Sequence, residues 1–98
     1  MGIYKYVVKP ADFHNIRYNV QTMKDILAGG VNAEETILEL DYSEVQHPIV
    51  SMSTGVTYEN IIRTGIQQIV IAGHKDKERL LANPLVSALV DQSKVVIL

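Results

Sequence analysis

The sequence predicts an α/β domain in which four strands alternate with helices in the order β-α-β-α-β-α-β. Short runs of β-branched and aromatic residues recur along the chain, and segments with apolar residues at three- and four-residue spacing separate them. The 98 residues are enough for a single small domain and too few for two. Strands joined by helical crossovers usually lie parallel. We therefore expect a four-stranded, mostly parallel (mixed) sheet with helices on both of its faces.

The first half of the chain contains two strand signals and one helix signal. Residues 3–8 are rich in Tyr, Ile and Val, as strands are. Residues 16–28 predict a helix that ends at Gly29-Gly30, where the backbone readily leaves the helical conformation. Residues 36–40 alternate in polarity and predict a strand. The apolar stripe of the helix consists of Ile16, Val20, Met23 and Leu27.

A long loop separates the second strand from the next helix. The loop is expected over residues 41–53, and Thr57 is the expected N-cap of a helix that ends at Gly65. Residues 68–72 contain three consecutive β-branched residues and predict the most buried strand. The middle of the chain therefore continues the alternation of strand and helix.

A proline divides the last third of the chain. Asp76 is a plausible cap for a short helix, Pro84 ends that helix, and Asn83 restarts a second helical turn. Residues 94–98 predict the last strand, and no helical pattern follows it. We therefore expect either a domain truncated at its C-terminus or a partner, such as a second copy, over apolar surface left uncovered.

Composition argues against several classes of function. Eleven acidic and nine basic residues give a formal net charge of −2, and no two basic residues are adjacent, so no nucleic-acid surface is expected. The absence of cysteine excludes disulfides and thiolate metal sites. No apolar run approaches the roughly 20 residues that cross a bilayer, and the N-terminus lacks the apolar core of a signal peptide. We expect a cytoplasmic protein with no cofactor and no membrane partner.

Most side chains with useful chemistry follow predicted strands. They lie in residues 41–57 and 73–76, and the carboxyl ends of parallel strands share one edge of a sheet, where ligands and partners gather. The candidate residues for binding a ligand at that edge are His47, Ser53, Thr54, Gly73, His74 and Lys75.

The segment Ser53-Thr54-Gly55 precedes a predicted helix. Free backbone N–H groups and the helix dipole favour an anion or a phosphorylated side chain at such a position. The alternative interpretation is that Ser53 and Thr54 only cap the helix or shape the loop.

The turn Gly73-His74-Lys75-Asp76 lies where a phosphate-binding turn would lie. Its single glycine matches neither the dinucleotide fingerprint nor the P-loop, and a solvated turn is the simpler interpretation. His47 and His74 could meet in space, but two histidines without an acid pair beside them are weak evidence for a metal site or a catalytic base. No catalytic residue is therefore assigned.

Residues 37–45 resemble the central strand and turn of STAS domains, the small folds of anti-sigma-factor antagonists and of sulfate-transporter tails. In that family a serine-bearing loop opens a helix, and a glycine-preceded apolar strand, a helix with an Arg-Leu-Leu-like start and another strand follow. The corresponding segments here are, in order, residues 52–56, 65–73, 79–81 and 95–98, so the resemblance covers roughly residues 14–98. Met52 stands where the family usually has Asp, the preceding loop is longer, and the closing helix of the family is missing.

The resemblance implies a regulatory protein-interaction module whose affinity is switched by phosphorylation. The switch would lie at Ser53, with Thr54 as the neighbouring candidate and Gly55 in the same partner-binding loop. The implied partner is a regulatory protein of the kinase-like or sigma-regulating kind, and a homodimer is a further expectation.

Two other classes of function stay open at this point. One is a small-molecule or nucleotide-binding domain that holds an anionic group between the turns at residues 53–55 and 73–75. The other is an enzyme in which His47 or His74 is the base or phosphoryl carrier. The interaction module is the leading hypothesis, and a role without enzymatic activity is favoured.

Overall fold

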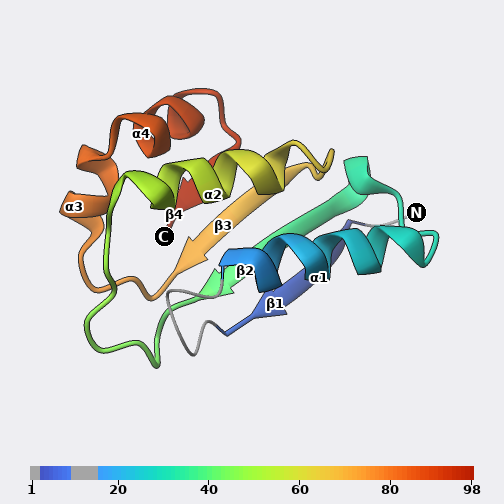
Figure 1. Ribbon diagram of the computed structural model, residues 1–98, viewed down its shortest axis with the longest axis horizontal. Coiled ribbons are helices and arrows are strands. Elements are labelled where there is room, and N and C mark those ends of the chain that lie inside the picture. Colours follow the sequence, from blue (N-terminus) through green and yellow to red (C-terminus); the bar gives the residue numbers. More distant parts are fainter. Residues whose placement is uncertain (1–2, 10–15) are drawn as a thin grey trace.

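The computed structural model describes residues 3–9 and 16–98, and its strands form one sheet in the order β1-β2-β3-β4 (Figure 1). Each neighbouring pair of strands is parallel. The predicted fold class is confirmed, and the sheet is wholly parallel. In chain order the elements are β1 (Tyr4–Val8), α1 (Ile16–Ala28), the 3-10 helix η1 (Ala33–Glu35), β2 (Thr36–Asp41), α2 (Met52–Ile62), β3 (Gln68–Ala72), α3 (Lys77–Ala82), α4 (Pro84–Asp91) and β4 (Val95–Ile97).

The long helices lie on one face of the sheet. Each strand is added beside its predecessor in the same direction, and right-handed crossovers then place every connecting helix on the same side. Helix α1 contacts α2, and α2 contacts α4, so these helices form a single layer across the strands (Figure 1). The expectation that helices cover both faces is therefore wrong for the described part of the chain.

Burial along the strands follows this two-layer arrangement. On β2, Leu38 and Leu40 are completely buried against the helices, whereas Ile37, which faces the other side of the sheet, is only half-buried. The buried set combines apolar side chains from β2, β3 and β4 with others from α1, α2 and α4. Its completely buried members include Met23, Leu38, Leu40, Ile61, Ile69, Ile71 and Val86.

The other face of the sheet mixes charged and apolar side chains. Lys5 on β1 forms an ion pair with Glu39 on β2, with 2.8 Å between Nζ and Oε1. Glu39 also lies in the register row that joins Val7, Val70 and Val96 across all four strands. The expected second copy over an uncovered face stays a prediction.

Helix α2 begins five residues before the predicted N-cap at Thr57. Its N-cap is Ser51, whose backbone N–H donates to Thr54 Oγ1 at 3.1 Å, while the Thr54 N–H donates to the Ser51 carbonyl at 3.0 Å. These bonds satisfy backbone groups that a helix start leaves open. Thr57 instead donates its hydroxyl to the Ser53 carbonyl one turn earlier. Residues 53–55 are therefore part of the helix rather than of the loop before it.

The junction between α2 and α4 depends on Asn83 and Gly55. Asn83 caps α4, as the sequence predicts, because its Oδ1 accepts from the N–H groups of Leu85 and Val86. Its Nδ2 also donates to the Ser51 carbonyl at 2.6 Å, which ties the starts of the two helices together. At Gly55 an added Cβ would lie 2.4 Å from the Leu85 Cβ and 2.9 Å from the Asn83 Oδ1. Only glycine lets the two helices approach this closely.

The substitution Gly55→Ala is expected to destabilise the fold. Alanine gains about 1 kcal/mol of helix propensity over glycine, but the clash with α4 and with the Asn83 cap outweighs this gain. We expect the free energy of unfolding to fall by about 1–2 kcal/mol. Chemical denaturation of both proteins measures the difference, and an unchanged or higher stability of Gly55→Ala would show that the helices are not in close contact.

Candidate functional site

The candidate site lies where β2 and β3 end, between the loop of residues 42–51 and the turn of residues 73–76. Lys75 joins the two segments, because its Nζ donates to the Ser43 carbonyl at 2.8 Å and to the Val45 carbonyl at 3.3 Å. The Tyr42 N–H also donates to the Ala72 carbonyl at 2.8 Å. Lys75, predicted as a ligand-binding residue, therefore holds the loop against the turn through these hydrogen bonds.

Gly73 makes the same contact possible from the backbone side. Its φ of +72° lies in the left-handed region, and an added Cβ would lie 2.9 Å from the Ser43 backbone nitrogen. Both constraints require glycine. The position predicted as part of a ligand-binding turn has a structural explanation in this close approach.

His74 is buried beneath the loop and is only 3% exposed. Its Nδ1 accepts from the Asp76 N–H at 3.1 Å, so the proton of the neutral ring must be on Nε2, which has no hydrogen-bond partner in the described part of the chain. The ring packs edge-on against Tyr42, with 5.0 Å between centroids. Burial lowers the pKa of His74, and nearby Lys75 lowers it further, while Asp76 opposes the shift.

A buried pair of tyrosines completes the interior behind His74. The hydroxyls of Tyr42 and Tyr58 lie 3.1 Å apart, and burial raises the pKa of both residues. They join the end of β2 to the middle of α2. Sequence reasoning missed this pair because the two residues are 16 positions apart and no local pattern links them.

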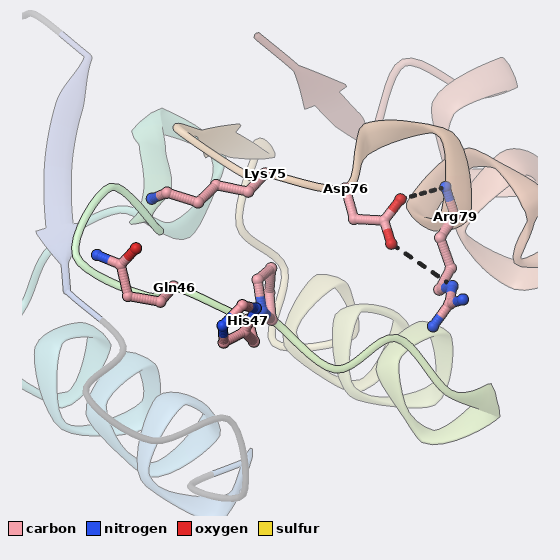
Figure 2. Close-up of a pocket in the computed structure, with 6 residues that line it drawn as sticks. Gln46, His47, Lys75, Asp76 and Arg79 are labelled. Carbon is pink, nitrogen blue, oxygen red and sulfur yellow. Dashed lines mark hydrogen bonds and ion pairs between the residues drawn. The ribbon is translucent and has the colours of Figure 1, made fainter.

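An open cleft of about 290 Å³ lies on the outer side of the same two segments (Figure 2). Its walls are polar apart from one proline. In Figure 2, His47 lies between Gln46 and the Asp76–Arg79 pair, and the Lys75 ammonium extends towards Gln46. The residues that line the cleft are Gln46, His47, Pro48, Lys75, Asp76 and Arg79.

The predicted ligand residues are divided between this cleft and other places. His47 and Lys75 line the cleft, whereas His74 is buried and does not. Residues 53–55 and Gly73 are not part of the lining of this cleft. Arg79 is not among the predicted ligand residues, and it lines the cleft because the loop of residues 42–51 lies beside α3.

Ser53, Thr54 and Gly55 differ in accessibility. Ser53 is exposed, and its hydroxyl lies 2.7 Å from that of Ser51. Thr54 is 1% exposed, and Gly55 is buried against α4. A modifying enzyme or a docking protein can therefore reach Ser53 directly but can reach Thr54 only after the helix start has opened.

Three large apolar side chains are exposed around Ser53. Met52 is 59% exposed and Val56 is 47% exposed, and their i, i+4 spacing places them on the same side of α2. Ile49, at the end of the preceding loop, is 51% exposed. We call Ile49, Met52, Ser53 and Val56 together the α2-start surface.

The histidines do not form a catalytic arrangement within the described residues. Neither His47 nor His74 is hydrogen-bonded to a carboxylate or to a serine hydroxyl there. The same residues contain no cluster of three His, Cys, Asp or Glu side chains able to hold a metal ion. Within them, no helix has both the length and the apolar character needed to cross a membrane.

No protein family, curated protein or solved structure matches this chain. The resemblance to STAS domains therefore stays a prediction, and the function must be argued from the residues themselves.

Acid is expected to weaken the fold through His74. The lowered pKa means that the unfolded chain binds a proton more readily than the folded one, so this residue contributes stability above about pH 6.5 that falls as the pH drops towards the folded pKa. In His74→Asn an amide oxygen can still accept from the Asp76 N–H but cannot titrate. We expect its unfolding free energy to lose less between pH 7 and about pH 5 than that of the wild type.

The matched control for this measurement is His47→Gln, because His47 is exposed and makes no hydrogen bond within the described residues. A smaller loss of stability in His74→Asn than in His47→Gln assigns the pH effect to the buried ring. Equal slopes for wild type and His74→Asn would show that the His74 pKa is the same in the folded and unfolded chains.

Proposed function

We propose that this chain is a regulatory protein-interaction module that docks a partner protein on the α2-start surface and is switched at Ser53. The observation that carries the proposal is the exposure of Met52 and Val56 in the same stretch of α2 as an accessible serine hydroxyl. Single exposed apolar residues are common, but a group of them at one place is typical of an interaction site. The STAS resemblance, which rests on the sequence alone, leads to the same serine.

The rigidity of the helix start supports a docking role. The Ser51 backbone is held by Thr54 and by Asn83, and Gly55 is packed against α4. A partner would therefore meet side chains on a preorganised helix turn, which limits the entropy lost on binding. We expect the partner to have an apolar pocket that binds the side chains of Met52 and Val56.

Phosphorylation of Ser53 would oppose that docking. A phosphate adds about −1.5 to −2 charge at neutral pH. At Ser53 this charge would lie in the same turn of α2 as Met52, one turn before Val56, where the partner is expected to be apolar. The start of α2 tolerates the phosphate because the helix dipole favours negative charge there. The modification would thus release the partner without unfolding the module.

Site-specific cross-linking tests the docking surface. A photoreactive amino acid placed at Val56 in cells of the source organism should give a discrete adduct with one partner protein. The matched control is Val7, which is also 47% exposed but lies on β1. Adducts that are the same from both positions, or absent from both, would contradict a docking site at the start of α2.

The variants Ser53→Asp and Ser53→Ala test the switch with the partner captured in that way. We expect Ser53→Asp to weaken binding by about tenfold, because a carboxylate would have to be desolvated against an apolar pocket. Ser53→Ala should bind at least as well as the wild type. Titration calorimetry measures both affinities, and identical values for the two variants would eliminate Ser53 as the switch.

A further inference from the structure

We propose that the cleft between residues 46–48 and α3 binds a small molecule through an oxyanion, either a phosphate or a carboxylate group. This site is separate from the α2-start surface and goes beyond the proposed docking function. Its lining residues come from two segments that the fold brings together at the carboxyl ends of β2 and β3.

The charge of the cleft favours an anion. Lys75 and Arg79 are the cations in its lining, and Asp76 is the carboxylate, so the formal balance is positive by one with His47 neutral. Asp76 is already engaged, because its Oδ1 accepts from the Arg79 backbone N–H at 3.3 Å and its Oδ2 lies 3.5 Å from the Arg79 Nε. The carboxylate therefore repels an incoming anion less than a free one would.

Three residues that line the cleft have side-chain N–H groups that make no hydrogen bond within the described residues. Asp76 engages only the Nε side of the Arg79 guanidinium, and the terminal amino groups make no hydrogen bond within the described residues. The side chains of Gln46 and His47 likewise have no hydrogen-bond partner there. Figure 2 shows His47 between Gln46 and the Arg79 side chain. A planar guanidinium fork with free amino groups suits the oxygens of a phosphate or carboxylate, and His47 lies on its Gln46 side in Figure 2.

The walls of the cleft are already in place. The Lys75 ammonium donates to the carbonyls of Ser43 and Val45, and these two bonds hold the loop in place. The same ammonium adds positive charge to the cleft. The volume of about 290 Å³ lies at the lower end of the range for small-molecule sites. It suits a compact metabolite better than a nucleotide, and the polar walls disfavour an apolar ligand.

Titration with inorganic phosphate, followed by two-dimensional NMR of backbone amides at constant ionic strength, tests the site. We expect saturable shifts confined to residues 46–48 and 75–79, with a Kd of about 1 mM or tighter. A parallel titration with acetate distinguishes the two oxyanions, because the class that saturates the same amides more tightly identifies the ligand chemistry. Shifts that do not saturate, or that spread over basic side chains elsewhere, would overturn the proposal.

The variant Arg79→Gln should weaken the phosphate affinity by about tenfold, since it removes the unpaired amino groups. It leaves the Asp76 cap intact, because that bond uses the backbone of residue 79. The matched control is Arg63→Gln. Arg63 is 72% exposed against 68% for Arg79, and each pairs with a carboxylate on or next to its own helix. Equal losses in both variants, or none in Arg79→Gln, would also overturn the proposal.

These results separate the site from the docking function. Arg79→Gln leaves Ile49, Met52 and Val56 unchanged, so it should still give the cross-link at position 56. Loss of phosphate binding with a retained cross-link is the expected combination.

Discussion

The parallel pairing of β2 and β3 is the constraint on which the rest of the molecule depends. Leu38 and Leu40 on one strand and Ile69 and Ile71 on the other present a continuous buried surface, and the helices are arranged to cover it. The same pairing brings the ends of the two strands together, so that the loop after β2 lies beside the turn after β3. Lys75 and Gly73 then fix that contact, and His74 is sealed beneath it. The core and the candidate site therefore have one common cause.

A second point of dependence is the junction at which α2 and α4 begin. Asn83 caps one helix with its oxygen and holds the start of the other with its amide nitrogen, while Gly55 removes the side chain that would keep them apart. This junction explains why the exposed side of α2 can carry apolar residues on a rigid frame. It also gives Thr54 and Gly55, in the first turn of α2, a role in stability.

The positions of the strands and the break between α3 and α4 were predictable from the sequence, because each has a local chemical cause. Contiguous β-branched residues gave β3, and the Asn83-Pro84 pair gave the start of α4. The start of α2 was not predictable from apolar spacing, since serine and threonine residues that bond to one another begin the helix before its first buried side chain. The cleft could not be read from the sequence either. It arises from contacts between Lys75 and carbonyls about 30 positions away, which no local pattern reports.

The strand order has a consequence for how the molecule is made. Because every strand pairs with its immediate predecessor in the chain, no later segment has to insert between strands that have already paired. Each strand-helix-strand unit could therefore join the growing edge of the sheet as it leaves the ribosome, much as successive units join a repeat protein. Pairing between neighbours in sequence also keeps loop closure short for a parallel sheet, a class of fold in which distant pairing usually slows assembly.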